Sequence, residues 1–165
     1  MVAQSFAAWI EGTALREFLL SLRWLWAICE TLHFFGLTVL IGSVGFLDLR
    51  LMGFMKSIPV STARSLVPWA IGAFILNLVT GVIFFLTFPA RYTDNGAFLA
   101  KMLFIVIAGI NVIFFETKFG ARVMSMGAIG DIPMSLKIVG AVSLFSWLAV
   151  LYFGRMLPYL WQGVF

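Results

Sequence analysis

The stretch that decides the fold is "WLWAICETLHFFGLTVLIGSVGFL", residues 24–47. An α-helix rises about 1.5 Å per residue and the hydrocarbon core of a bilayer is about 30 Å thick, so a crossing helix needs roughly 20 mainly apolar residues. This run is long enough, and Glu30 and His33 are its only acidic or basic side chains. It predicts a membrane-spanning helix.

Three further apolar runs have the same length, at residues 66–88, 97–119 and 138–160. In lipid every backbone polar group needs a partner inside the protein, so such runs form helices unless they close a barrel. The alternating ten-residue segments of a barrel are absent. The sequence therefore predicts an all-α, integral membrane four-helix bundle, with residues 1–165 forming a single transmembrane domain.

The composition agrees with this fold class. Of the 165 residues, 62% are hydrophobic and only 11% are charged, which is more apolar surface than a soluble domain of this length can bury. The net charge of +4 does not indicate nucleic-acid binding, because the basic residues lie mostly in short loops beside apolar runs, where lipid headgroups are their usual partners. The lipid bilayer is the predicted partner.

The ends of the spans give an orientation. Residues 5–20 mix large apolar and charged side chains, and predict an interfacial amphipathic helix or an extension of the first span. The loops after the first and third spans carry slightly more Lys and Arg than the other side, and Arg50 is counted among them. That bias places these loops in the cytoplasm and both termini in the periplasm, in a bacterial inner (cytoplasmic) membrane.

Four polar residues are expected in the outer half of the bundle. Glu30 and His33 are three residues apart, so they share a helical face, roughly 9 and 13 Å below the outer interface. Arg155 lies near the outer end of the fourth span and Lys101 enters the third span from the same side. We expect Glu30 to pair with Arg155, or Arg155 to bind an anionic ligand group, because a lone charge at this depth is costly.

Each of these residues also has a structural interpretation. Arg155 and Lys101 can extend to the headgroups, and His33 can be a hydrogen-bonded structural residue. The small side chains of Cys29, Gly36 and Ser43 recur every seven residues beside His33. Such a stripe allows the close approach of another helix, and it equally leaves room for a flat ring.

Two further features concern packing and solvation. Ala73, Asn77 and Gly81 fall on one face of the second span and predict a packing seam. Glu116 and Lys118 are interpreted as solvated residues at the cytoplasmic interface. With a single His and a single Cys, no zinc site of the usual ligand spacing is predicted, and the phosphate-binding and hydrolase motifs are absent. We name no catalytic residue.

At "ETLHFFGLTVLIGSVGFLDLRLMG", residues 30–53, the sequence resembles an uncharacterised bacterial family of short four-helix membrane proteins, with the pattern E-x-x-H-x-x-G followed by D-L-R-L-x-G. The match continues through "PWAIGAF" (68–74) and "AKMLFIVIAGIN" (100–111), so it covers nearly the whole chain. Many members have a histidine at the position of Glu116. This resemblance implies an architecture and no activity.

The chain is also similar, more faintly, to haem-dependent membrane protoporphyrinogen oxidases and to CopD-like copper-resistance proteins. The similarity rests on His33, Gly36, Arg50 and Lys101. It implies that His33 is an axial ligand of b-type haem, and therefore the metal-binding residue, with Lys101 as a second ligand or a propionate contact. Glu30 and Arg155 complete the predicted cofactor-binding set. Because the chain has one His, the haem would be five-coordinate, or its sixth ligand would be Lys101 or a methionine, or it would be shared with another copy in a homo-oligomer.

These observations leave three functional hypotheses. The first is a b-type haem protein that takes part in membrane electron transfer, with quinone as the partner. The second is a non-catalytic accessory or assembly subunit of a larger membrane complex. The third, a transporter with Glu30 and His33 as a proton relay, is disfavoured because no broken helix pair or inverted repeat is visible.

Overall fold

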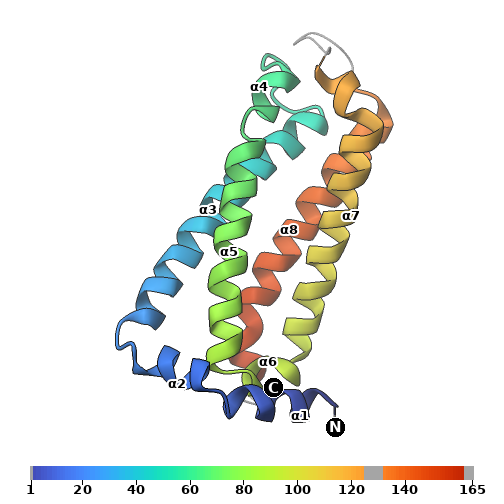
Figure 1. The fold of residues 1–165 in the computed structure, drawn as a ribbon. Coiled ribbons are helices and arrows are strands. Elements are labelled where there is room, and N and C mark those ends of the chain that lie inside the picture. Colours follow the sequence, from blue (N-terminus) through green and yellow to red (C-terminus); the bar gives the residue numbers. More distant parts are fainter. Residues whose placement is uncertain (1, 125–131, 162–165) are drawn as a thin grey trace.

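The computed structural model describes residues 2–124 and 132–161. Within them the chain is helical, and its long helices stand side by side while the short N-terminal ones lie across one end (Figure 1). The helices are α1 (Val2–Glu11), α2 (Ala14–Ser21), α3 (Leu25–Leu51), α4 (Val60–Arg64), α5 (Val67–Thr87), α6 (Ala90–Thr93), α7 (Gly96–Met124) and α8 (Met134–Trp161).

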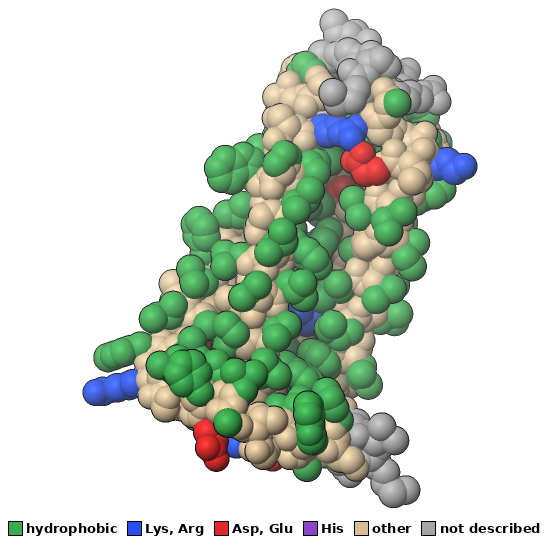
Figure 2. Space-filling model, viewed as in Figure 1, with side chains coloured by type: hydrophobic (Ala, Val, Ile, Leu, Met, Phe, Trp, Pro, Cys, Tyr) green, Lys and Arg blue, Asp and Glu red, His purple; other side chains and the backbone are tan. Residues whose placement is uncertain are grey.

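Four of these helices, α3, α5, α7 and α8, are long and apolar enough to cross a membrane. Each of the four predicted spans falls on one of them. Hydrophobic side chains cover most of the visible face between the two ends of the molecule, and most of the charged ones lie near the ends (Figure 2). A face of this kind suits hydrocarbon and not water. The protein is a small multi-pass membrane protein, and the predicted fold class is confirmed.

The four long helices form two pairs. α3 packs along α5, α7 packs along α8, and α3 also contacts α8, which joins the pairs. α5 and α7 meet near the end that carries α1 and α2, called here the N-terminal end, where the rings of Phe85 and Phe98 stack with their centroids 5.9 Å apart. Further along, their ribbons stand apart (Figure 1), and the two helices are not one of the closely packed pairs. The bundle is therefore less tightly packed between α5 and α7 than within either pair.

The contact between α3 and α8 depends on Gly140. A β-carbon added to Gly140 would lie 2.8 Å from the backbone oxygen of Asp48 and 3.1 Å from Cβ of Leu51. Both atoms belong to the last turns of α3, so only glycine permits this separation. Small residues that let helix backbones approach are a main source of helix association in lipid, where burial of apolar surface gives no advantage over contact with acyl chains.

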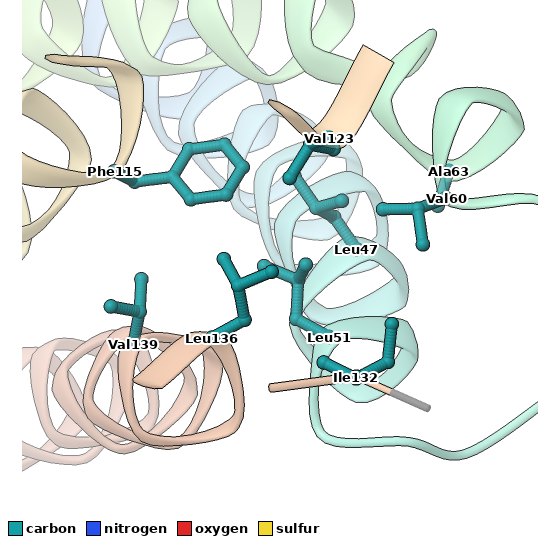
Figure 3. Close-up of a cluster of buried hydrophobic side chains, with 9 residues drawn as sticks. All are labelled: Leu47, Leu51, Val60, Ala63, Phe115, Val123, Ile132, Leu136 and Val139. Atoms are coloured by element: carbon teal, nitrogen blue, oxygen red, sulfur yellow. The ribbon is translucent and has the colours of Figure 1, made fainter. Parts of the chain in front are cut away.

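A cluster of buried apolar side chains holds together the opposite end of the molecule, called here the α4 end. Four helices, α3, α4, α7 and α8, supply most of it, and Val60, Ala63, Val123 and Leu136 are fully buried. Figure 3 shows these side chains converging from separate parts of the chain. The cluster consists of Leu47, Leu51, Val60, Ala63, Phe115, Val123, Ile132, Leu136 and Val139.

The end of α3 differs from the prediction. Arg50 was expected in a loop facing lipid headgroups, but it lies in the last turn of α3, is 1% exposed, and donates from Nε to the carbonyl of Ile58 at 2.5 Å. Gly53 follows the helix with φ +99°, and the amide of Phe54 donates to the carbonyl of Leu49. This is the Schellman arrangement, which requires a left-handed residue after the helix. The chain therefore turns back over the helix end, and Arg50 fastens it there.

The N-terminal segment forms two short helices, α1 and α2, instead of extending α3. Thr13 caps α2 by accepting from the amide of Arg16, and the Arg16 side chain donates from Nε to the carbonyl of Thr87 at 3.1 Å. That bond satisfies a carbonyl in the last turn of α5, which has no partner inside its own helix. Phe6, Trp9 and Phe18 remain exposed, as the interfacial alternative predicts.

We predict that Gly140→Ala lowers the thermal stability of the protein in detergent, by about 1–3 kcal/mol, because the new methyl group overpacks the α3–α8 contact. Gly72→Ala on α5 is the matched control, since a β-carbon there meets nothing within 4 Å. Removing a helical glycine at such a site should be neutral or stabilising, by up to about 1 kcal/mol. Melting curves followed by circular dichroism measure both changes. Equal effects of the two substitutions would contradict the role given to Gly140.

Candidate functional site

The imidazole of His33 is held by α5. Its Nδ1 lies 2.6 Å from Oγ1 of Thr80, and that hydroxyl is also 2.8 Å from the carbonyl of Leu76. A hydroxyl has one proton to donate, and a backbone carbonyl can only accept it. Both contacts are hydrogen bonds when Thr80 donates to its own helix and accepts from His33. We infer this arrangement, which places the proton on Nδ1 and the lone pair on Nε2.

The surroundings of the ring come from both helix pairs. On α5 the ring of Phe84 lies 5.5 Å from the imidazole, centroid to centroid. The nearest atom to a β-carbon on Gly81 would be Cε1 of His33, at 3.9 Å. From the other pair, the positive charge of Lys101 acts on the imidazole.

Lys101 belongs to α7 but packs against α8. A β-carbon on Gly154 would lie 3.8 Å from both Cδ and Nζ of Lys101. The half-buried lysine thus runs along α8 instead of extending straight to a headgroup layer. The expected approach of Lys101 to His33 stays a prediction.

Glu30 and Arg155 do not join this group. Both side chains are exposed, and the guanidinium of Arg155 lies over the ring of Tyr159, 5.8 Å from its centroid. Among the described residues, the structure gives no ion pair between Glu30 and Arg155. The pairing prediction was wrong because similar depth in the membrane does not fix direction. The buried face of α3 contains Cys29 and Gly36, and Glu30 lies outside that face.

The stripe of small residues receives a helix at Gly36. A β-carbon on Gly36 would lie 2.7 Å from Nδ2 of Asn77, so the glycine makes room for that amide. Asn77 and Ala73 are both buried. The packing seam predicted on α5 is confirmed, and at this point the room beside His33 is filled by α5.

Asp48 is a buried polar residue that the site prediction missed. It is 3% exposed, and its carboxyl group hydrogen-bonds with the hydroxyl of Ser143 on α8. Its Oδ2 atom is buried and has no hydrogen-bond partner within the described residues. The sequence signal was the D-L-R-L-x-G pattern, in which Asp48 had been given no role.

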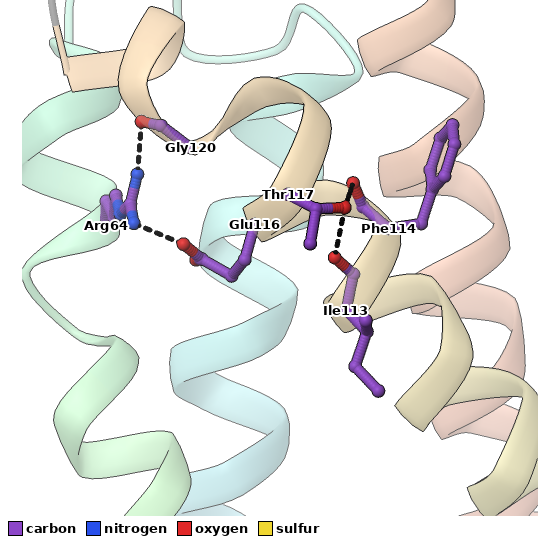
Figure 4. A network of polar contacts seen from close by, with 6 residues as sticks. All are labelled: Arg64, Ile113, Phe114, Glu116, Thr117 and Gly120. Carbon is purple, nitrogen blue, oxygen red and sulfur yellow. Dashed lines mark hydrogen bonds and ion pairs between the residues drawn. The ribbon is translucent and has the colours of Figure 1, made fainter.

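At the α4 end, an ion pair between Arg64 and Glu116 links α4 to α7. Nη2 of Arg64 is 2.5 Å from Oε2 of Glu116, and Nη1 donates to the carbonyl of Gly120 at 2.6 Å, as Figure 4 shows. The carboxylate is exposed, as the interpretation of Glu116 as a solvated residue expects, and it is also bound to an arginine, which the sequence did not predict. Solvent screening limits the contribution of such a pair to stability, to about 0–1 kcal/mol.

Two cavities accompany these groups. One, of about 340 Å³, lies between α2 and the neighbouring ends of α3 and α5, and its walls include Arg23, Trp26, Phe84 and Arg91. The other, of about 210 Å³, lies among α3, α5, α7 and α8, and its walls include Asp48. Neither cavity has His33 in its lining.

A family of unknown function, DUF6644, matches residues 7–160. The chain belongs to this family. No curated protein matches the chain, and no solved structure matches it either. Membership in DUF6644 agrees with the resemblance to an uncharacterised family. The similarity to haem-dependent oxidases and CopD-like proteins stays a hypothesis.

We predict that Glu30 and Arg155 act independently. Replacing each with Gln, singly and together, should give stability changes that add within about 0.5 kcal/mol, because the two side chains share no contact. Thermal unfolding of the four proteins in the same detergent measures this cycle. A coupling energy of 1 kcal/mol or more would restore the ion pair.

We also predict the tautomer of His33. The chain has one His, so ¹⁵N-histidine labelling yields a single pair of imidazole signals. At mildly alkaline pH, where free imidazole is neutral, Nδ1 should resonate as a protonated nitrogen and Nε2 as an unprotonated one. Thr80→Val should weaken this preference, whereas Thr38→Ala, on the exposed side of α3, should not change it. A proton on Nε2 in the unmodified protein would contradict the assignment.

Proposed function

We propose that this membrane protein binds b-type haem through His33 and takes part in membrane electron transfer, with quinone as the redox partner. The observation that carries the proposal is the hydrogen bond between Nδ1 of His33 and Thr80. Metal-binding histidines commonly donate their second ring N–H to an oxygen, which fixes the tautomer and makes the other nitrogen a better ligand. In the tautomer inferred above, Nε2 of His33 has the lone pair that an iron ligand needs.

The donor set suits haem better than a bare metal ion. Within residues 2–124 and 132–161, no three His, Cys, Asp or Glu side chains come together as a metal-binding group. Haem iron takes four ligands from its own macrocycle and needs only one or two from the protein. A single histidine is therefore sufficient for haem and insufficient for zinc.

The other residues would have separate tasks. Lys101, whose charge acts on the His33 ring, would serve as a second ligand or bind a propionate. The exposed Arg155 would take part only as a propionate contact near the interface. Glu30, exposed and without an ion pair to Arg155 in the described part of the chain, would have no direct contact. Bound haem would supply a one-electron couple between ferric and ferrous iron.

The test is the absorption spectrum of purified protein, oxidised and then reduced with dithionite. We expect a Soret band in the unmodified protein and in Thr38→Ala, and its loss in His33→Ala. Added imidazole should restore the band in His33→Ala, because a free ligand can replace a missing side chain but cannot repair a folding defect. A folded protein without a Soret band after expression with haem precursors would exclude this function.

A second measurement separates ligation from simple packing. Thr80→Val removes the hydrogen bond to Nδ1, which makes the imidazole a weaker electron donor to iron. The midpoint potential of the haem should therefore rise in Thr80→Val and stay unchanged in Thr38→Ala. If haem is absent and the protein co-purifies with larger membrane proteins, the accessory-subunit hypothesis takes its place.

A further inference from the structure

The cavity beside Asp48 has the dimensions of a small-ligand site. Its volume is about 210 Å³, whereas an apolar cavity of about 150 Å³ is sufficient to bind benzene. Its walls are mostly apolar, with Phe74 and Trp147 forming an edge-to-face aromatic pair whose centroids are 6.0 Å apart. One aromatic ring with one or two substituents would fit.

The cavity also contains an incomplete hydrogen-bonding group. Asp48 lines it and is 3% exposed. One side of the carboxyl group is bound by the hydroxyl of Ser143, while Oδ2 has no partner within the described residues. A buried acceptor without a donor costs about 1–3 kcal/mol, and more when it is charged. A ligand that brings a donor would remove that cost.

The cavity is accessible from the membrane, between α5 and α7. α5 and α7 are not one of the closely packed helix pairs, and both contribute to the walls of the cavity, α5 with Ile71 and α7 with Gly109 and Val112. At the α4 end, the pair of Arg64 and Glu116 bridges the two sides. The opening thus faces the hydrocarbon. A neutral ligand crosses such an opening easily, whereas an ammonium ion would have to lose its hydration in lipid.

We propose that this cavity binds a neutral, membrane-soluble aromatic alcohol, such as a phenol or the ring of a quinol, whose hydroxyl donates to Oδ2 of Asp48. The aromatic walls hold the ring, and Ser143 keeps the carboxyl group oriented. No residue of the proposed haem site takes part in this second site. Its presence is therefore independent of haem binding.

The test uses 4-bromophenol and its methyl ether, 4-bromoanisole, with the protein in lipid nanodiscs. Bromine quenches tryptophan fluorescence on contact, and Trp147 lines the cavity. We expect saturable quenching that disappears in Trp147→Phe. The phenol should bind at least about tenfold more tightly than the ether, because a hydrogen bond to a carboxylate contributes that much. In Asp48→Leu the ratio of the two affinities should fall to about one.

A matched pair of glycine variants locates the site. Gly109 and Gly72 both have open space where a β-carbon would stand, but only Gly109 lines the cavity. Gly109→Leu should abolish saturable binding of both probes, and Gly72→Leu should leave it unchanged.

The same experiments can overturn the proposal. Equal affinities of phenol and ether in the unmodified protein would remove the role of Asp48, and equal effects of the two glycine variants would remove the cavity. Tighter binding of 4-bromobenzylammonium than of the phenol would replace the alcohol with a cation. Absence of saturable quenching would exclude the site.

Discussion

The contact on which the rest of the structure depends is the crossing of α3 and α8 at Gly140. α3 carries α5 and α8 carries α7, so this crossing joins the two helix pairs. It brings a backbone oxygen of α3 within 2.8 Å of the position that a β-carbon of residue 140 would occupy. In lipid, such close packing must replace the hydrophobic effect as the cause of association. Because the pairs are joined through α3 and α8, α5 and α7 are left apart, and the cavity beside Asp48 lies behind that opening.

The fold could be predicted because lipid permits so few alternatives. The length and hydropathy of four runs were sufficient to place four helices, since an unpaired backbone is too costly in hydrocarbon. The helix ends were less accurate for an equally physical reason. Arg50 was counted as a loop cation because it follows an apolar run. Its burial depends on the carbonyl of Ile58, which the chain brings back only after the turn at Gly53.

The site could be predicted only in part. His33 stands out in any apolar run, but its partner Thr80 is one of several hydroxyl residues in the spans, and the sequence does not contain the register between α3 and α5. Counting residues gives depth, and depth alone suggested the wrong pair for Glu30. Asp48 was overlooked for the opposite reason. It stands near the end of a span, where carboxylates usually meet water, and only the approach of α8 at Gly140 and Ser143 buries it.

His33 and Asp48 differ in how their polar groups are satisfied, and this difference separates two kinds of site on one helix. They are about 22 Å apart along α3 at 1.5 Å per residue, and each contacts a different neighbour, α5 in one case and α8 in the other. In the inferred tautomer, the Nδ1 proton of His33 is bound by Thr80, so the ring offers only the lone pair of Nε2 to a metal. Asp48 keeps a buried oxygen without a donor. This unpaired oxygen is costly unless a bound ligand supplies a donor. The side of the bundle between α5 and α7 is where such a ligand can enter.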